Sequence, residues 1–229
     1  MESKLLQLNG SEWSAFRLGE KAWLLTPRDS NVQLRLIHEA TKIIEDSNIN
    51  GIVDIIPAYD SITLIFDRAD IDIKISMSQI SVSPSPKKDS VLHKINVCYE
   101  LGLDWEEVEG ITGLKKEEII SIHLSPTYTV AMTGFLPGFI FLEGLDERII
   151  APRRSNPRTA IPSGAVGIGG SQTGIYSLES PGGWQIIGRS SELFFNKHKN
   201  PPMQVKAGDR IEFQRISETE YQKKEPIHE

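Results

Sequence analysis

From residue 128 onwards, glycine and proline interrupt the chain so often that no long helical pattern develops, and this constrains the fold more than any other feature. Between the interruptions lie short apolar runs rich in β-forming side chains. Many short strands separated by turn signals are typical of a β-barrel or a β-sandwich. We therefore predict strands at residues 139–142, 165–168, 174–176, 185–187 and 210–213.

The first 80 residues show other periodicities and predict a small α/β unit. Two hairpins are expected where β-forming runs flank turn residues, at residues 16–26 and 52–66. Between them, apolar side chains recur at helical spacing over residues 32–46, which predicts an amphipathic helix. Apolar and polar residues alternate strictly over residues 71–77, which favours a further strand. The order β-β-α-β-β suits a small open-faced sandwich.

The boundary between two domains is predicted at residues 81–90, Ser-Val-Ser-Pro-Ser-Pro-Lys-Lys-Asp-Ser. Its prolines and serines do not pack, and it separates two apolar segments. We therefore expect an N-terminal α/β domain over residues 1–88 and a β-rich domain over residues 89–229, which is an α+β fold class. Two short helices are predicted at the start of the second domain, at residues 104–108 and 115–124.

Composition excludes several classes of protein. With 229 residues, of which 39% are hydrophobic, the chain can bury a real core, and its formal charge of −6 argues against a general nucleic-acid binder. Cys98 is the only cysteine, so neither an internal disulfide nor a cysteine-based metal cluster is expected.

The chain is expected to be cytoplasmic. Its first ten residues include Glu2 and Lys4 and lack a long apolar stretch, so they do not resemble a signal peptide. Residues 124–142 carry no charge, but glycines and prolines such as Pro137 make a membrane span a poor interpretation of them.

A local excess of arginine stands out in the second half. Residues 149–189 contain one acid, Glu179, and four arginines, which are Arg153, Arg154, Arg158 and Arg189. Arginine binds carboxylate or phosphate groups bidentately, and neighbouring prolines stiffen its presentation. An anion-binding site is one interpretation; a solvated charged loop, or an arginine paired with a nearby acid, is the other.

Two glycine-rich segments lie on either side of the arginines. Residues 134–142 combine two glycines, a proline and three phenylalanines, which indicates a sharply bent loop with aromatic anchors. Residues 159–178 are uncharged, and their glycines could expose backbone N–H groups to an oxyanion. The second segment lacks the lysine of a phosphate-binding P-loop. A packed barrel corner and barrel turns without a ligand are the alternatives.

The histidines give little information about a functional site. No metal site is expected, because no partner at metal-ligand spacing accompanies His38, His93, His198 or His228. His123 differs by its position beside the bent glycine-aromatic loop, although a lone histidine at a helix end more often caps carbonyls than catalyses.

Several motifs follow one another in a fixed order over about 65 residues. They are Phe135-Leu136-Pro137-Gly138-Phe139, Pro152-Arg153-Arg154 with Pro157-Arg158, Ile161-Pro162-Ser163-Gly164-Ala165-Val166-Gly167-Ile168, Gln172-Thr173-Gly174-Ile175-Tyr176, and Ser180-Pro181-Gly182-Gly183-Trp184-Gln185-Ile186-Ile187-Gly188-Arg189. In this order they resemble the signature of a family that includes the 5-oxoprolinase B subunit, allophanate hydrolase subunit 1 and the Kip-type histidine kinase inhibitor. His123 with Tyr128-Thr129-Val130 matches the segment just upstream.

This resemblance implies a small α/β sandwich domain followed by a cyclophilin-like β-barrel domain. It implies a heteromeric, ATP-dependent enzyme, with Mg, that opens 5-oxoproline to glutamate by activating the lactam carbonyl with phosphate. The implied partners are a cyclophilin-like C subunit together with a lactam-binding A subunit. Related chains are fused into the carboxyltransferase part of urea carboxylase.

The resemblance also supplies candidate site residues. It implies catalytic roles for His123, Tyr128, Arg153 and Arg158. It implies substrate or anion binding by Arg154, Gln172, Tyr176 and Trp184, with glycine-loop amides polarising a carbonyl. The chain departs from the family pattern at Tyr99-Glu100-Leu101-Gly102-Leu103-Asp104-Trp105, where a longer glycine-rich stretch is usual.

Two other functions stay open at this point. The same motifs suit a binding protein that inhibits a sensor histidine kinase by docking the barrel onto its helical dimerisation domain. A prolyl isomerase is supported only by the implied fold, and fold alone does not fix function.

Overall fold

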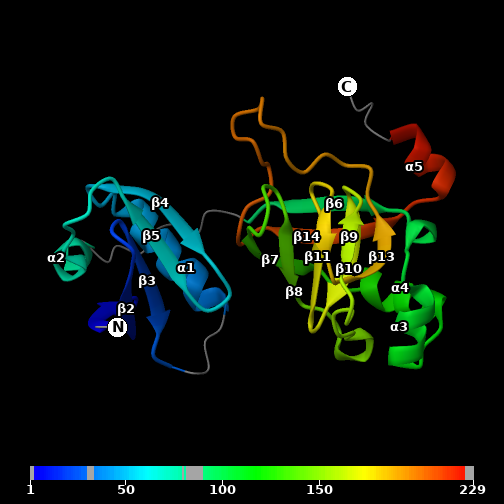
Figure 1. Cartoon of the computed structure of the whole chain (residues 1–229), viewed down its shortest axis with the longest axis horizontal. Coiled ribbons are helices and arrows are strands. Elements are labelled where there is room, and N and C mark those ends of the chain that lie inside the picture. Colours follow the sequence, from blue (N-terminus) through cyan, green and yellow to red (C-terminus); the bar gives the residue numbers. More distant parts are fainter. Residues whose placement is uncertain (1–2, 30–33, 79, 81–89, 225–229) are drawn as a thin grey trace. The chain divides into compact units, whose positions relative to one another are not determined.

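The computed structural model describes residues 3–29, 34–78, 80 and 90–224. Contacts along the chain divide it into two compact units, residues 1–89 and residues 90–229, which are described separately (Figure 1). Most of the predicted linker lies outside the described residues. Overall the chain is a mixed α/β protein built mostly from sheets.

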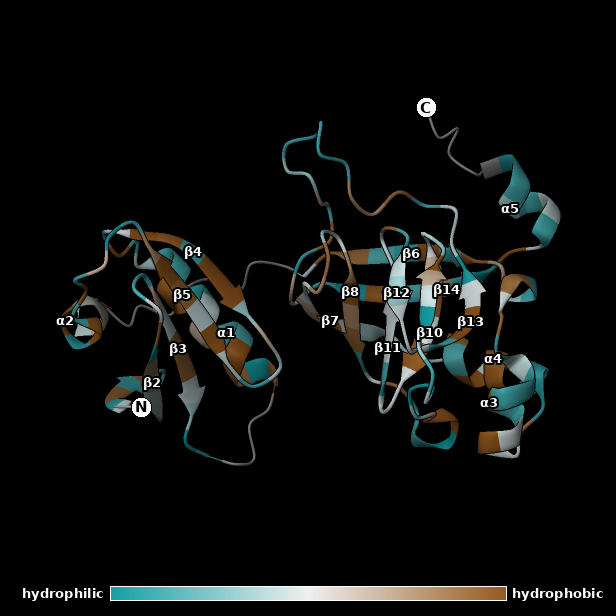
Figure 2. Ribbon diagram, in the orientation of Figure 1, coloured by the Kyte–Doolittle hydropathy of each residue, from teal (hydrophilic) through white to brown (hydrophobic). Residues whose placement is uncertain are grey.

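The first unit is a five-stranded antiparallel sheet with a helix packed on it (Figure 1). The strands lie in the order β1 (Ser3–Leu8), β2 (Ser11–Leu18), β3 (Ala22–Pro27), β5 (Ile62–Phe66) and β4 (Ile52–Pro57). Both predicted hairpins are confirmed. The predicted helix is confirmed as α1 (Leu34–Asp46), while its expected start at Val32 lies outside the described residues. Its buried residues join the sheet in one core, and β4 and β5 are mainly apolar in Figure 2.

The strand predicted over residues 71–77 was wrong, because the segment forms a short helix, α2 (Ile73–Ser78). The Asp72 carboxylate accepts a hydrogen bond from the backbone N–H of Lys74 at 3.0 Å, which satisfies a free donor of the first turn. Ile73 and Met77, one helical turn apart, are buried, whereas Ile75 is exposed. Two residues of the alternating pattern, at positions i and i+4, therefore lie on the same buried face of a helix.

The second unit is a nearly closed, barrel-like sheet of seven strands (Figure 1). In spatial order they are β13 (Gln185–Arg189), β10 (Ala165–Gly169), β11 (Gln172–Ile175), β8 (Ile140–Glu143), β7 (Tyr128–Thr133), β14 (Arg210–Arg215) and β6 (Leu92–Val97). The pairs are antiparallel except β14 with β6. Cys98, which follows β6, exchanges two backbone hydrogen bonds with Arg189 of β13, at 2.8 and 3.0 Å. This bridge joins the two edges of the sheet.

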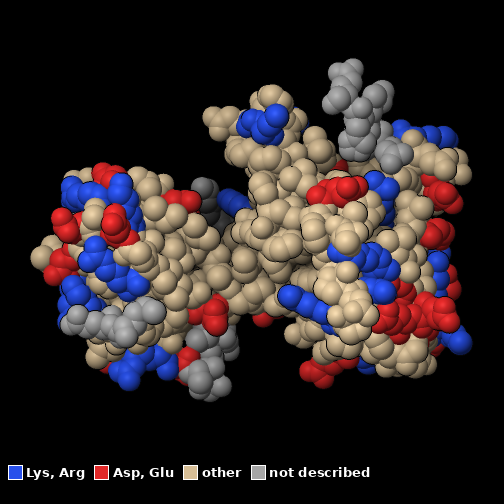
Figure 3. Space-filling model, in the orientation of Figure 1, with Lys and Arg blue, Asp and Glu red and all other residues tan. Residues whose placement is uncertain are grey.

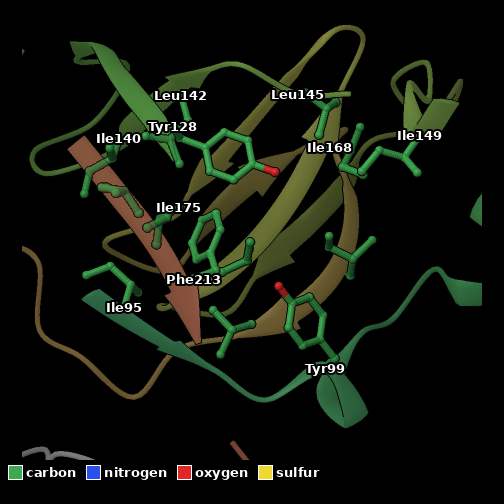
Figure 4. Packing of buried hydrophobic residues seen from close by; sticks show 14 of the residues in the cluster. Ile95, Tyr99, Tyr128, Ile140, Leu142, Leu145, Ile149, Ile168, Ile175 and Phe213 are labelled. Atoms are coloured by element: carbon green, nitrogen blue, oxygen red, sulfur yellow. The ribbon is translucent and has the colours of Figure 1, made fainter. Parts of the chain in front are cut away.

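An apolar core fills the inside of this sheet (Figure 4). Side chains such as Ile140, Leu142, Ile168 and Ile175 alternate inward from the strands and are fully buried. Burying one such side chain contributes about 1.5–3 kcal/mol. Five of these strands were predicted correctly from short apolar runs bounded by turn residues.

Helices lie outside the barrel sheet (Figure 1). The two predicted ones are confirmed as α3 (Trp105–Thr112) and α4 (Lys116–Leu124), with short 3-10 turns at Tyr99–Leu101 and Glu147–Ile149. Helix α5 (Glu218–Lys224) was not predicted; it is polar apart from Tyr221, as its teal colour in Figure 2 shows. Over the described residues, helices lack the length and apolar character needed to span a bilayer.

A two-stranded sheet completes the second unit. It pairs β9 (Arg158–Ile161) with β12 (Ser180–Gly182) in antiparallel fashion. Strand β9 follows the predicted arginine segment, and strand β12 precedes Trp184. Their pairing therefore brings the arginine segment next to Trp184.

Candidate functional site

Trp184 lies against the outer face of the barrel sheet, where two glycines leave room for its ring. A Cβ atom on Gly169 would come within 2.5 Å of the indole Cε2, and one on Gly174 within 3.0 Å of Cζ3. Real Cβ atoms essentially never come within 3.0 Å of such atoms, so Gly169 does not accept a side chain while the indole stays in place. At Gly174 the backbone carbonyl oxygen of Ile140, 2.7 Å from the Cβ position, excludes a side chain in addition to the tight indole contact. The indole is 4% exposed.

Other aromatic rings surround Trp184 and form a second apolar cluster outside the barrel core. The ring centroids of Phe139, Phe141 and Tyr176 lie 5.5, 5.8 and 6.5 Å from that of Trp184, all in edge-to-face arrangements. Phe135 stacks edge-on against Phe139 but is 70% exposed and has a positive φ of 68°. The bent loop with aromatic anchors is therefore present, and its phenylalanines lead to Trp184.

The arginine segment runs alongside this cluster. The backbone N–H of Arg154 donates to the carbonyl oxygen of Gly183 at 2.7 Å, which fixes the segment beside Trp184. The guanidinium carbon of Arg153 lies 5.7 Å from the Trp184 ring centroid, in a cation–π arrangement. We call Arg153, Tyr176 and Trp184, with the surrounding phenylalanines, the Trp184 face.

The two other arginines of the segment converge on one buried acid. The carboxylate of Asp104 is 1% exposed and accepts hydrogen bonds from Arg154 Nη1 at 2.6 Å and from both terminal nitrogens of Arg158. It also accepts the backbone N–H of Ile186 at 2.6 Å. Both carboxylate oxygens are thus fully used, as a buried charge requires.

Glu107 and Gln185 extend this network. Glu107 accepts from Arg154 Nη1 at 2.7 Å and from Gln185 Nε2 at 3.0 Å, and the same Gln185 nitrogen donates to the carbonyl oxygen of Pro152 at 3.1 Å. Two acids therefore face two arginines. Figure 3 shows acidic and basic side chains interleaved over the α3 end of this unit.

Asp104 was missed as a site residue, and its position explains why. An Asp just before a helix is usually an N-cap, but this side chain makes no capping hydrogen bond to α3. Its partners lie about 50 and 82 positions further along the chain. Nothing near Asp104 in the sequence marks it as a partner of the arginine segment.

His123 and Tyr128, predicted as catalytic, lie inside the barrel. The hydroxyl of Thr173 donates to the carbonyl oxygen of Gly167 at 3.0 Å, so it accepts a hydrogen bond from His123 Nε2 at 3.0 Å. His123 Nδ1 therefore accepts from the hydroxyl of Tyr99 at 2.7 Å. Burial lowers the pKa of His123 to about 3, so the imidazole is neutral at ordinary pH.

These interior residues and the Trp184 face lie on opposite sides of the same strand. Thr173, which contacts His123, and Gly174, which lies under Trp184, are neighbours in β11, and neighbouring side chains point to opposite faces of a sheet. The Tyr128 hydroxyl donates to the carbonyl oxygen of His123 at 2.8 Å, and burial raises its pKa. The structure thus does not bring His123 and Tyr128 together with the arginines.

The glycine amides that the sequence suggested as carbonyl-polarising groups serve the fold. The N–H of Gly164 donates to the carbonyl oxygen of Tyr176, and that of Gly170 to the carbonyl oxygen of Ala151, both at 2.7 Å. Gly174 lies in β11, which is paired on both sides. Gln172 begins the same strand, opposite Gly169, and is half-buried.

A family model described as the carboxyltransferase domain, subdomain C and D, matches residues 13–205. The chain belongs to this family. It is 39% identical over 224 residues to the 5-oxoprolinase B subunit of Bacillus subtilis (strain 168), covering 90% of this chain and 93% of the relative. It is 32% identical over 207 residues to the protein of the same name in Escherichia coli O157:H7, covering 86% and 94%. The family resemblance predicted from the motifs is confirmed.

A solved structure supports the fold of this carboxyltransferase-family chain. The crystal structure of the K. lactis urea amidolyase superimposes with a TM-score of 0.74 over 96% of this chain, at 19% identity. The matched region is 16% of that much longer protein. This likeness concerns the fold alone.

Proposed function

We propose that this chain is the B subunit of a heteromeric, ATP-dependent 5-oxoprolinase, which opens the lactam ring of 5-oxoproline to give glutamate. The main support for this proposal is the 39% identity to a 5-oxoprolinase B subunit over 90% of this chain. Because the relatives are named as subunits, we propose a cyclophilin-like C subunit together with a lactam-binding A subunit as partners.

The Trp184 face is the proposed contribution of this chain to the site. Arg153, Tyr176 and Trp184 meet there, whereas His123 and Tyr128 are enclosed on the other side of the sheet. The proposed roles of His123 and Tyr128 are therefore structural: they hold α4 and β7 in the barrel through buried hydrogen bonds.

ATP, with Mg, supplies the phosphoryl group that activates the lactam carbonyl. Triphosphate sites gather several cations and backbone donors around the phosphates. Arg154 and Arg158 are already paired with Asp104 and Glu107, so this face alone fits a triphosphate poorly. We therefore propose that ATP binds in the assembled complex with most of its contacts from the partner subunits.

Two further parts of the proposal concern the whole chain. The nearly closed barrel of the second unit is proposed to be cyclophilin-like, and the two compact units to be separate domains joined near residue 89. The complex is proposed to work in the cytoplasm.

The test is reconstitution. The full chain is co-purified with the lactam-binding and cyclophilin-like partner proteins of the same genome, and 5-oxoproline-dependent release of ADP and glutamate is measured. We expect turnover that disappears when this chain is omitted. An inactive complete complex, together with tight inhibition of a sensor histidine kinase by the isolated chain, would replace this proposal by the kinase-inhibitor function.

A further inference from the structure

The three arginines of the segment 153–158 are not equivalent. Arg154 and Arg158 are 27% and 23% exposed at their side chains, and both bind the buried carboxylate of Asp104. Arg153 is exposed, and within the described part of the chain no carboxylate lies within ion-pair distance of its guanidinium. Its guanidinium instead lies over the ring of Trp184. One positive charge of the segment is therefore left over for a ligand.

We infer that Arg153 alone in this segment binds the substrate anion, that this anion is a single carboxylate, and that Arg154 and Arg158 act as structural ties. This inference rests on the proposed function, and it assigns the carboxylate of 5-oxoproline to the Trp184 face. The triphosphate of ATP is held elsewhere in the complex.

The surroundings of Arg153 suit a carboxylate. A cation–π contact uses none of the N–H donors of a guanidinium, so the paired donors that match the two oxygens of a carboxylate stay available. The contact also orients the side chain before the ligand arrives, which reduces the entropy lost on binding.

Tyr176 lies in the aromatic cluster beneath Arg153 and is buried. Burial raises the pKa of its hydroxyl to about 12, although the backbone N–H of Trp184 and the charge of Arg153 act in the opposite direction. The hydroxyl therefore keeps its proton at neutral pH. Tyr176 is 1% exposed, so it supports the Trp184 ring from inside the cluster, and the exposed guanidinium of Arg153 is the group that meets the anion.

The charge balance argues for a single carboxylate. Asp104 and Glu107 compensate Arg154 and Arg158, so the segment presents the unit charge of Arg153. A triphosphate carries several negative charges, and its usual sites combine lysine, arginine, metal ions and backbone donors. A unit charge matches a small monocarboxylate.

The experiment measures KM values for both substrates in the reconstituted complex. Arg153→Gln is expected to raise the KM for 5-oxoproline about 10- to 100-fold, because charge-assisted hydrogen bonds to the carboxylate are lost. The KM for ATP should change by less than about twofold, since no phosphate contact is removed. Arg153→Lys keeps the charge but loses the paired geometry, and should recover part of the loss.

A neutral analogue separates direct contact from an indirect effect. The amide of 5-oxoproline lacks the carboxylate charge and is used as a competitive inhibitor. The wild-type complex should bind it about 10-fold or more weakly than 5-oxoproline, and Arg153→Gln should nearly remove that difference. A purely structural role for Arg153 would weaken both ligands alike.

Two arginines serve as matched controls. Arg148→Gln removes an exposed guanidinium that is paired with Asp146, and should leave both KM values unchanged. Arg158→Gln should lower the midpoint of thermal unfolding of the isolated chain, whereas Arg153→Gln should not. Equal destabilisation by the two variants would contradict the division of roles.

The outcomes separate this inference from the proposed function. A wild-type complex without 5-oxoproline-dependent turnover overturns the proposed function and the inference with it. An active wild-type complex in which Arg153→Gln raises the KM for ATP, or leaves the KM for 5-oxoproline unchanged, overturns the inference alone.

Discussion

The two faces of strand β11 use polar groups in opposite ways. On the inner face, Thr173, His123 and Tyr99 form a closed chain of neutral hydrogen bonds without solvent access. On the outer face, Gly174 leaves room for Trp184 and the arginines that accompany it. The charged groups beside the outer face include the exposed Arg153 and the buried carboxylate of Asp104, which is fully paired. The comparison separates residues that stabilise the fold from residues that can contact a substrate.

The largest loss of stability is expected when the buried acid Asp104 is replaced. Asp104→Ala removes the partner of two guanidinium groups and of the Ile186 N–H, and should lower the free energy of unfolding by about 3–5 kcal/mol. Urea denaturation of the isolated chain measures it. Glu106→Ala, an exposed acid of the same helix, is the control and should change stability by about 0.5 kcal/mol or less. Equal losses in the two variants would show that Asp104 is not the structural tie.

The next effect concerns the space under Trp184. Gly169→Ala places a methyl group against the indole and should cost about 1–3 kcal/mol, with a shift in tryptophan fluorescence as the ring moves. Gly110→Ala is the matched control, because nothing lies within 4 Å of its Cβ position in helix α3. That change should stabilise the chain by about 0.5–1 kcal/mol. An unchanged stability of Gly169→Ala would mean that the indole does not need a glycine beneath it.

A smaller effect should appear as pH dependence from the inner face. The pKa of His123 falls from its usual 6.5 to about 3 in the folded chain, because burial disfavours the charged imidazole. Between these values the unfolded chain binds a proton that the folded chain does not. Stability should therefore fall as pH decreases below 6.5, by about 1.4 kcal/mol per pH unit from this residue.

The comparison with His123→Gln isolates this contribution. Urea denaturation at pH 6.5, 6 and 5 should show a steeper loss for wild type than for the variant, since the other histidines are shared. Parallel curves would indicate that His123 is already protonated in the folded chain.

The smallest effect on stability is expected at Arg153. Its guanidinium is exposed and contacts one ring face, so Arg153→Gln should change the free energy of unfolding by about 1 kcal/mol or less. Urea denaturation checks this value. A loss as large as that of Asp104→Ala would move Arg153 from the ligand-binding to the structural group.

Local patterns in the sequence located most strands, because turn residues mark their ends without help from distant residues. Strands β1 (Ser3–Leu8), β6, β7, β9 and β12 and helix α5 were not predicted, and α2 was mistaken for a strand. In α2 the deciding contact is the hydrogen bond from Lys74 to Asp72, which outweighs a short alternating pattern.

The site was predicted less well than the fold, because its residues are far apart in sequence. The motifs drew attention to Arg153, Tyr176 and Trp184, yet they could not show which face of β11 each residue occupies. Location beside the bent loop suggested a site role for His123, while the strand register puts its partner Thr173 inside the barrel. Asp104 has no local signature, since its partners come from β9, β13 and the arginine segment.

The fit between one indole and two bare backbone positions also restricts how this surface can diverge. Alanine at position 169 becomes possible only after Trp184 is replaced by a smaller side chain, whereas alanine at position 174 would still meet the backbone carbonyl oxygen of Ile140 at 2.7 Å. Homologous chains should therefore exchange residues 169 and 184 together and keep glycine at 174, and a chain without the indole should also lack the cation–π partner of Arg153.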